Sequence, residues 1–559
     1  MKPVTLIGLS VLALAACAPR QPVGTPTPVP PPSTAPPPAA TAAPAAPLLE
    51  APATWQLLDE QADRVRGISA ARAARELLAG RQPKQDVVVA IIDSGVDTAH
   101  ASLRGSLWTN PKEVAGNGKD DDGNGYVDDV HGWNFIGGKD GRDVDHDTYE
   151  VTRLYVALKA KCEEKKPAGP TGSVDCARYP EVKREFESKR QEAEQNVQQV
   201  RAIGGAYAGA TALLKQFLMT DSLSTAKVSA IQTTRPDVRQ AQQIYLQLAA
   251  NGITEHALDE AKDEYEGQLQ YGLNPSYDPR DVVGDNYADP AERHYGNRDV
   301  TGPNAMHGTH VSGIIGAAPG NSAGIQGIDP SVRLMIVRAV PDGDERDKDV
   351  ANAIRYAADN GARVINMSFG KAYSPYKTAV DEAVRYAQSK GVLFVHAAGN
   401  DAEDLGQAPN FPSRTYLDGG EAANWIEVGA SSWKAADSLA ANFTNYGQKQ
   451  VDVFAPGVDI LSTVPGGAFE RESGTSMAAP VVTGLAALLL SYYPNLTAAD
   501  VKRIILESAT RYPTESVLKP GGSGEHVPFG SLSATGGVVN AYNALKMAAE
   551  VSRTRPASQ

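Results

Sequence analysis

Residues 474–480 read Gly-Thr-Ser-Met-Ala-Ala-Pro, and an apolar run from Val481 to Leu490 follows them directly. A run that is apolar on all sides predicts a helix buried in the middle of a large core. Ser476 then lies at the start of that helix, where unpaired backbone N–H groups and the positive end of the dipole favour negative charge. This setting suits a serine nucleophile and its oxyanion, and Pro480 fits the first turn, where no intrahelical donor is lost. A plain helix cap is the alternative that these residues alone leave open.

Two segments far from Ser476 supply the partners that a serine nucleophile needs. Val87–Ile92 is a nearly continuous β-branched run, which is typical of a parallel strand buried on both faces, and Asp93 follows it. Open α/β sheets place their sites at the carboxyl ends of such strands. The other segment, from His307 to Gly316, is rich in small residues that would let a helix pack closely on the sheet while His307 faces the cleft.

The order Asp93, His307 and Ser476, each with these flanking residues, resembles the subtilisin-like serine protease superfamily. The resemblance covers the chain from about Trp55 to Ala549, apart from one large insertion. It implies an α/β fold with three α/β/α layers and a mostly parallel central sheet. It also implies serine-type endopeptidase activity, in which peptide bonds are hydrolysed through an acyl-enzyme.

A fourth segment agrees with this resemblance. Gly391–Ala397 predicts a buried strand that runs into Asn400, which matches the family residue whose amide binds the oxyanion. An asparagine in a strand-end turn is the alternative. The resemblance further implies that an extended peptide substrate adds to a strand edge. The residues that match the family's substrate-binding positions are Ser368, Phe369, Gly370, Ala398 and Gly399.

The residue types predict the chemical roles. Ser476 needs a neighbouring base, and His307 can take its proton and later give it to the leaving amine. Asp93 would fix the histidine tautomer and stabilise the imidazolium. These steps require no cofactor. We expect His310 to be a packed or capping histidine and Asp97 to serve the turn after Asp93.

Composition excludes one class of partner. The chain has 559 residues, of which 66 are acidic and 53 basic, so its formal net charge is −13. This balance, without a basic cluster, argues against nucleic acid as a partner. We expect a soluble exported enzyme that acts on polypeptides as a monomer.

Residues 1–17 resemble a bacterial lipoprotein signal peptide. The apolar run Val4–Ala16 is too short for a permanent membrane span and suits an export signal. It ends in Leu-Ala-Ala before Cys17, which resembles the lipobox, so we expect Cys17 to be lipidated; ordinary cleavage with an incidental Cys17 is the alternative. Residues 18–53 are rich in Pro, Ala and Thr and predict a disordered linker. The expected location is the bacterial cell envelope, at the outer membrane, facing the periplasm or the exterior.

The protease domain is expected over residues 54–136 and 291–550, with a disordered tail at 551–559. Residues 53–85 precede the strand that bears the aspartate, and Ile68–Leu78 predicts an amphipathic helix of the enzyme itself. We therefore expect no detachable propeptide.

Residues 137–290 form a polar, helix-rich insertion between the aspartate and histidine motifs. Its pattern predicts a helical hairpin or small bundle laid on the protease at the rim of the cleft, and leaves open whether it restricts access, holds a partner or braces the fold. Export to an oxidising compartment favours a disulfide between Cys162 and Cys176, with two free thiols as the alternative. The predicted helices are Pro180–Gln199, Ala202–Met219, Pro236–Ala250 and Thr254–Leu273.

An acidic loop at residues 117–129 follows positions 1, 3, 5, 6 and 9 of a calcium-binding loop. His131 stands at the twelfth position, where an EF-hand has glutamate, so the loop is no EF-hand. A structural calcium ion is the functional prediction, and a solvated turn with outward-pointing acids is the alternative. The predicted ligands are Asp120, Asp122, Asn124, Asp128 and the carbonyl of Tyr126.

A second class of function competes with the protease. An intact but catalytically silent fold could serve as a scaffold or binding module through its helical insertion. A hydrolase that acts on esters is a variant of the endopeptidase hypothesis. The presence of Asp93, His307 and Ser476 together favours the endopeptidase.

Overall fold

The computed structural model of the protein describes residues 50–165, 175–434 and 436–555. Cys17, the signal peptide and nearly all of the predicted linker lie outside these residues. Within them, nine strands form one sheet in the order β10, β13, β7, β6, β5, β4, β1, β3 and β2. Neighbouring strands are parallel except for β10 and β13, which confirms the predicted α/β fold. The strands are β1 (Val88–Asp93), β2 (Gly132–Asn134), β3 (Arg333–Arg338), β4 (Val364–Met367), β5 (Leu393–Ala397), β6 (Trp425–Ser431), β7 (Val453–Pro456), β10 (Thr510–Arg511) and β13 (Gly537–Val538).

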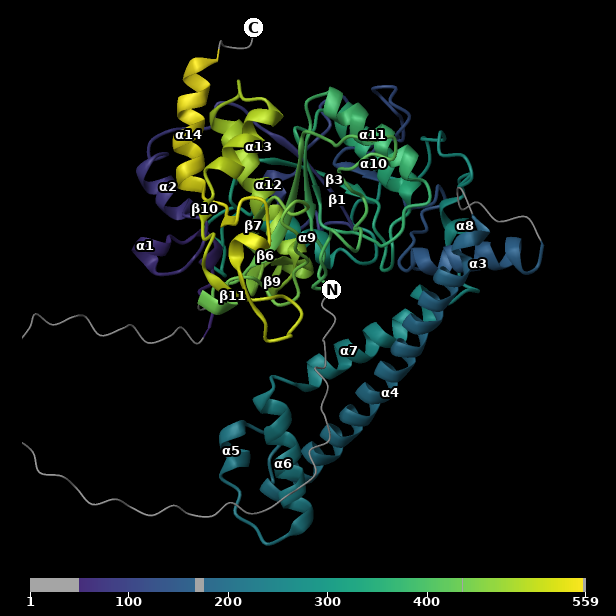
Figure 1. The fold of residues 1–559 in the computed structure, drawn as a ribbon, viewed down its shortest axis with the longest axis vertical. Coiled ribbons are helices and arrows are strands. Elements are labelled where there is room, and N and C mark those ends of the chain that lie inside the picture. Colours follow the sequence, from purple (N-terminus) through teal and green to yellow (C-terminus); the bar gives the residue numbers. More distant parts are fainter. Residues whose placement is uncertain (1–49, 166–174, 435, 556–559) are drawn as a thin grey trace, which may run out of the picture.

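Each face of the sheet has its own hydrophobic core, because side chains alternate along every strand. In β1, Val89 and Ile91 enter one core, whereas Ala90 and Ile92 enter the other. Figure 1 shows the sheet between the two helical layers. The first layer contains α2 (Ala70–Glu76), α9 (Met306–Gly316), α12 (Thr475–Tyr492), α13 (Ala498–Glu507) and α14 (Ala541–Thr554), and the second contains α10 (Asp347–Asp359) and α11 (Lys377–Ser389).

Helix α12 is the buried helix that the apolar run predicted. Every residue of α12 except Ser476 is buried. In length and hydropathy α12 alone among the described helices could cross a membrane, but 94% of it is buried inside the protein. It is therefore the central helix of the first layer.

The segment before β1 belongs to the protease body. Trp55 and Ile68 are fully buried in the first core. The Trp55 indole donates a hydrogen bond to the Val458 carbonyl at 3.0 Å, and the backbone N–H of Ala541 donates to the Ile68 carbonyl at 2.7 Å. Both contacts join this segment to parts of the chain more than 400 residues away.

The remaining elements of the body are short. Helix α1 covers Glu60–Asp63, and two hairpins are formed by β8 (Ile460–Val464) with β9 (Ala468–Glu472) and by β11 (Ser516–Leu518) with β12 (His526–Pro528). Single 3-10 turns lie at Trp55–Leu57, Arg104–Ser106, Cys176–Arg178, Ala436–Ser438, Pro465–Gly467 and Phe529–Ser531.

The insertion projects from the body as an arm, which we define as residues 150–273 (Figure 1). Its main helix, α4 (Tyr179–Leu218), has 40 residues and is about 60 Å long at 1.5 Å per residue. The arm also contains α3 (Glu150–Cys162), α5 (Thr225–Ser229), α6 (Pro236–Ala250) and α7 (Glu255–Gly267), which continues into a π-helical turn at Gln268–Gly272.

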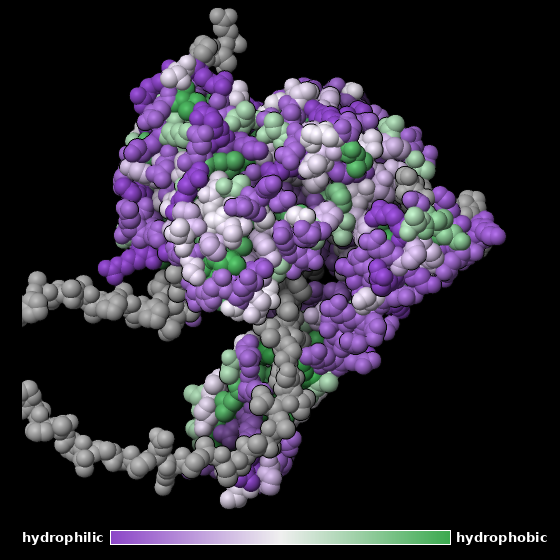
Figure 2. Space-filling model, in the orientation of Figure 1, coloured by the Kyte–Doolittle hydropathy of each residue, from purple (hydrophilic) through white to green (hydrophobic). Residues whose placement is uncertain are grey.

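Three small apolar clusters hold the arm together. At its root, Leu154 of α3 packs with Val182 and Phe186 of α4. Val197 of α4 packs with Ala261 of α7 in the middle, and Leu214 of α4 packs with Val238 of α6 at the tip. Hydrophilic side chains cover most of the visible face of α4 in Figure 2. The insertion was predicted to be laid on the protease. Instead, the arm projects from it.

Three predicted boundaries differ from the structure. The two helices predicted at 180–199 and 202–219 are one helix, α4. Residues 137–149 and 274–290 pack on the body, where Val144 and Val283 join the second core, and α8 (Arg280–Val283) lies in this part. Helix α14 extends through residues 551–554 of the predicted tail, and just after its end the Arg555 guanidinium binds Asp500 at 2.8 Å.

Candidate active site

Ser476 is the second residue of α12 and is partly exposed, as a nucleophile must be. Its hydroxyl donates a hydrogen bond to the Ser368 carbonyl at 3.0 Å. In return, the Ser368 hydroxyl donates to the Ser476 carbonyl at 3.0 Å. The strand end after β4 and the start of α12 are therefore joined side by side at this serine.

Pro480 has a different role from the one predicted. Since α12 begins at Thr475, Pro480 is the sixth residue of the helix and lies beyond its first turn. A residue at this position normally donates its N–H to the carbonyl four residues earlier, which is that of Ser476. Proline has no N–H, so the Ser476 carbonyl is left to accept the hydrogen bond of Ser368.

Asp93 and His307 meet at the carboxyl end of β1. The two side chains are hydrogen bonded, with Nδ1 of His307 2.7 Å from Oδ1 of Asp93. The carboxylate is 2% exposed, and its Oδ1 also accepts the Ser94 backbone N–H at 2.8 Å. A Cβ at Gly308 would lie 2.2 Å from the Gly95 carbonyl, so only glycine lets α9 approach the aspartate this closely. The small residue after His307 thus sets the distance between the two groups.

The His307 side chain is 22% exposed, so its Nε2 atom, which does not bind Asp93, can face the cleft. No hydrogen bond joins Ser476 to His307 within the described residues. Hydrogen bonds of a catalytic serine are often long before substrate binds and tighten in the complex. Rotation of the Ser476 hydroxyl away from the Ser368 carbonyl is the change that the chemistry requires.

Asn400 follows β5 and is held by the residue before the serine. Its Oδ1 accepts hydrogen bonds from the backbone N–H of Thr475 at 2.9 Å and from the Thr475 hydroxyl at 3.0 Å. Because the oxygen is engaged in this way, the Nδ2 amide remains to donate elsewhere. A Cβ built on Gly474 would lie 3.6 Å from that Nδ2 atom. The amide is therefore beside the N-terminus of α12, where an oxyanion would form.

Comparison with known proteins agrees with this geometry. Residues 84–524 match the model of the subtilase family. The chain belongs to the subtilase family.

Relatives of this subtilase include a thermophilic serine proteinase from Bacillus sp. (strain AK1), which is 41% identical over 43% of this chain and 52% of the relative. Subtilisin DY from Bacillus licheniformis is 34% identical over 44% of this chain and 82% of the relative. The chain thus spans about half the length of the first of these curated relatives. A solved cold-adapted subtilisin-like serine proteinase is 30% identical over 43% of this chain and 77% of its own, with a TM-score of 0.34.

The residues predicted to bind substrate lie on both sides of Ser476. Ser368 touches Ser476 directly, and Phe369 and Gly370 continue the same segment with Gly370 exposed. Ala398 and Gly399 lie at the end of β5, and the Gly399 N–H donates to the Thr475 hydroxyl at 3.1 Å.

Asn410 joins these two segments and was not predicted. Its Nδ2 atom donates to the carbonyls of Ala397 and Ala398, at 3.1 and 3.2 Å. A Cβ at Gly370 would lie 2.2 Å from the Asn410 Oδ1 atom. The residue belongs to a loop with no periodic pattern, so only the three-dimensional structure reveals its position.

His310 and Asp97 have the structural roles that the sequence indicated. His310 is fully buried, and its Nε2 atom lies 3.0 Å from the Ile460 carbonyl and 3.1 Å from that of Glu470. Burial lowers the pKa of His310 to about 4. The Asp97 carboxylate accepts the N–H groups of Ala99 and Gly466, at 2.9 and 3.0 Å.

The acidic loop contains a carboxylate cluster whose members differ from the predicted ligands. Glu113, Asp120 and Asp122 each place one oxygen within 4.8 Å of the others. Glu113 lies outside the linear motif, and its Oε2 atom is buried without a hydrogen-bond partner among the described residues. Three carboxylates, of which Glu113 has an oxygen without a hydrogen bond, fit a hard cation such as calcium.

Two predicted ligands of the loop make other side-chain contacts. Asp128 binds the Arg298 guanidinium and accepts the Gly118 N–H at 2.9 Å. Asn124 donates its amide to Asp129 at 3.0 Å, while its oxygen accepts the N–H of Tyr126 at 2.8 Å. The side-chain oxygens of Asp128 and Asn124 thus accept hydrogen bonds within the loop, as those of Asp120 and Asp122 also do.

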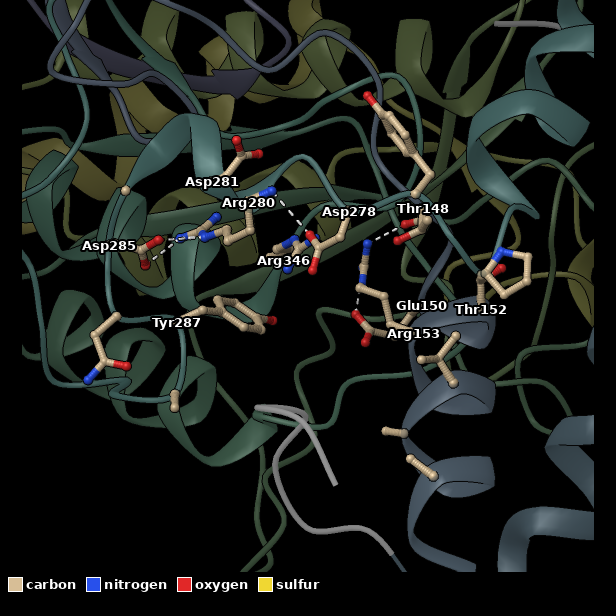
Figure 3. A pocket seen from close by; sticks show the side chains of 18 residues that line it. Thr148, Glu150, Thr152, Arg153, Asp278, Arg280, Asp281, Asp285, Tyr287 and Arg346 are labelled. Carbon is tan, nitrogen blue, oxygen red and sulfur yellow. Dashed lines mark hydrogen bonds and ion pairs between the residues drawn. The ribbon is translucent and has the colours of Figure 1, made fainter. Parts of the chain in front are cut away.

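The root of the arm carries both a disulfide and a cavity. Cys162 and Cys176 are joined by a disulfide, which ties the end of α3 to the start of α4. A cavity of about 590 Å³ lies between α3 and the segment 275–288 (Figure 3). Glu150, Arg153 and Arg346 line it, so buried charges surround a space that is separate from the catalytic side chains.

Proposed function

We propose that this subtilase is an exported serine endopeptidase that hydrolyses peptide bonds through an acyl-enzyme. The observation that carries the proposal is the 2.7 Å hydrogen bond between His307 and Asp93, with Ser476 at the N-terminus of a buried helix that packs against α9, the helix of His307. Polypeptides are the proposed substrates, because an extended chain can pair with the exposed edge at Gly370.

In the proposed mechanism, three side chains carry out the proton transfers. The Ser476 hydroxyl attacks the substrate carbonyl while His307 takes its proton. Asp93 holds the imidazole through Nδ1 and stabilises the imidazolium. His307 then gives the proton to the leaving amine, and water releases the acyl group by the reverse sequence of proton transfers.

The negative charge formed during attack has two proposed donors. The Asn400 amide lies beside Gly474, and the backbone N–H of Ser476 points out of the first turn of α12. Both donors are fixed before substrate arrives, so they stabilise the oxyanion without reorganisation of the protein.

The test uses the full chain and an unfolded polypeptide as substrate. Mass spectrometry of the products should show cuts within the polypeptide, with each cut absent for Ser476→Ala. The sites found would also identify which residue the enzyme prefers at the cut. Unchanged substrate after incubation with folded wild-type protein would favour the scaffold function instead.

We also propose that Cys17 carries a lipid that anchors the enzyme in the bacterial cell envelope. The support is the position of Cys17 directly after an export signal, with a linker of 36 residues (18–53) before the protease body. In fractionated cells, Cys17→Ser should move the enzyme from the membrane to the soluble fraction. A variant that stays in the membrane fraction contradicts the anchor.

A structural calcium ion is the third proposal, with Glu113, Asp120 and Asp122 as its side-chain ligands. The carboxylate cluster supports it. Chelation should lower the thermal midpoint of the wild type, and calcium but not magnesium should restore it. The same midpoint should be insensitive to chelation in Glu113→Gln, and an insensitive wild type contradicts the site.

A further inference from the structure

We call residues 368–370, which were predicted to bind substrate, the substrate-binding edge. The arm contacts the segment that carries this edge at Lys371, the residue directly after Gly370. The Lys371 ammonium is buried and makes three contacts: 2.9 Å to Oε2 of Glu150, 2.8 Å to Oδ1 of Asp347 and 2.7 Å to the Glu345 carbonyl. An ammonium group has three N–H donors, so every donor of Lys371 has a partner. Glu150 is the first residue of α3, so one of these partners belongs to the arm.

Glu150 is itself held from several directions. Its backbone N–H donates to Oδ2 of Asp344 at 2.7 Å, and its Oε2 atom also accepts a hydrogen bond from Arg153 at 2.7 Å. Figure 3 shows Arg153 reaching from Glu150 to Thr148. Burial alone would raise the pKa of Glu150, but the charges of Arg153 and Lys371 outweigh it and lower that pKa to about 2. The carboxylate is therefore ionised and fixed where it meets Lys371.

A second contact joins the arm to the same segment two residues later. The Tyr373 hydroxyl is hydrogen bonded to the Glu185 carboxylate of α4. The Arg178 guanidinium lies over the Tyr373 ring, 5.5 Å from its centre, and the ring packs against the apolar cluster at the root of the arm. Both main helices of the root, α3 and α4, thus contact residues 371–373.

The opposite side of the segment is held by the protease body. Lys371 and Phe411 exchange two backbone hydrogen bonds, of 2.9 and 2.8 Å. Gly370 has no side chain and is exposed, and its backbone lies against the Asn410 side chain, which also belongs to the body. The position of the substrate-binding edge therefore depends on the residues that flank it, of which Lys371 is the nearest on the side away from Ser476.

We propose that the arm positions the substrate-binding edge, with Glu150 and Lys371 as the positioning residues. This inference rests on the proposed peptidase function. Because the segment leads away from Ser476, we place the affected substrate residues on the acyl side, farther from the scissile bond. Holding the edge in its binding conformation reduces the entropy lost when an extended peptide is ordered on it. The arm therefore favours long peptides over small acyl substrates.

The test compares two substrates of the full-length enzyme that share one acyl residue, chosen from the cleavage sites of the wild type. One is a peptide anilide with four residues on the acyl side, and the other is an ester of the single acyl residue. Glu150→Gln keeps the shape of the side chain and removes its charge. It should raise KM for the peptide roughly tenfold, which is the effect of weakening one charge-assisted contact, and change the ester by less than about twofold.

Two further variants distinguish a local effect on the substrate-binding edge from a general loss of folding. Tyr373→Phe leaves no buried charge unpaired and should raise the same KM about two- to threefold. Glu266→Gln removes a 2.9 Å ion pair with Arg201 elsewhere in the arm and should change neither substrate. Thermal midpoints of all variants are measured alongside.

The outcomes separate the inference from the proposed function. An equal rise in KM for both substrates would mean that Glu150→Gln weakens the whole site. An unchanged KM for the peptide would mean that the arm does not act on the substrate-binding edge. Either result overturns this inference but leaves the proposed function in place. A folded wild type that hydrolyses neither substrate overturns the proposed function and this inference together. A tenfold change confined to the peptide supports both.

Discussion

Helices α12 of the body and α4 of the arm are stabilised in different ways. All residues of α12 but Ser476 are buried, whereas α4 buries 8 of its 40 residues along one stripe. A helix enclosed on every side is held in one position, and so is the serine at its end. A helix with one apolar stripe tolerates change on its other faces. Substitutions in the body should therefore affect chemistry and global stability, and those along the arm should remain local.

The largest effect is expected for His307, the proposed catalytic base. His307→Ala should lower kcat by roughly six orders of magnitude, the scale known for the corresponding change in subtilisin. His256→Ala is the matched change in the arm, where the imidazole is 81% exposed and pairs with Glu260, and should leave kcat unchanged. Peptide hydrolysis by both purified variants measures the two kcat values. Comparable kcat values would contradict the expected difference between the body and the arm.

Asn400, the proposed oxyanion donor, gives the next effect. Asn400→Ala should lower kcat roughly 100- to 1,000-fold with little change in KM, because the amide is needed mainly in the transition state. Asn251→Ala changes an exposed asparagine that caps α6 through a 2.7 Å hydrogen bond to the Gln247 carbonyl. It should leave both constants as they are. A change in KM alone for Asn400→Ala would place the amide in substrate binding instead.

Two leucine substitutions compare the cores of the two regions. Leu485 in α12 and Leu214 in α4 are both fully buried. Leu485→Ala should lower the free energy of unfolding of the body by about 2–5 kcal/mol. Leu214→Ala should open the arm tip and leave kcat and the main unfolding transition of the body in place. Hydrogen exchange resolved by segment distinguishes them, and equal protection losses across the body would contradict a locally stabilised arm.

The smallest effect concerns pH. His310 is buried and its pKa falls from 6.5 to about 4, so the unfolded chain binds a proton there that the folded protein does not. This stability is present above pH 6.5 and is lost as the pH falls towards 4, by up to about 3 kcal/mol. Urea unfolding at pH 7 and 4.5 should show a smaller loss for His310→Gln than for the wild type. The exposed His256→Gln should lose as much as the wild type, and identical losses in all three would contradict the assignment.

Much of the body was predictable because its signals are local. Strand β1 is a continuous apolar run with Asp93 at its end, and His307, Asn400 and Ser476 stand at matching ends of elements that the sequence pattern marks. Parallel strands bring such ends to one edge of a sheet. The placement of these residues followed from topology, without knowledge of any side-chain contact.

The arm was harder to predict because its structure depends on distant contacts. The sequence pattern predicted a break between the helices at 180–199 and 202–219, yet α4 is continuous there, and Val197 and Val200 pack against α7 close to the predicted break. Glu113 and Glu150 were missed for a similar reason. Glu113 precedes the acidic motif, and Glu150 meets Lys371 across 221 residues of sequence.

The most direct test of the central claim is covalent labelling of the serine. Wild-type protein treated with a fluorophosphonate should gain one phosphonyl group, which peptide mapping should locate on Ser476. The adduct should be absent in Ser476→Ala and strongly slowed in His307→Ala, because the base no longer removes the proton. Labelling of Ser476 at the same rate in His307→Ala, or no labelling of folded wild-type protein, would contradict a serine activated by His307 and Asp93.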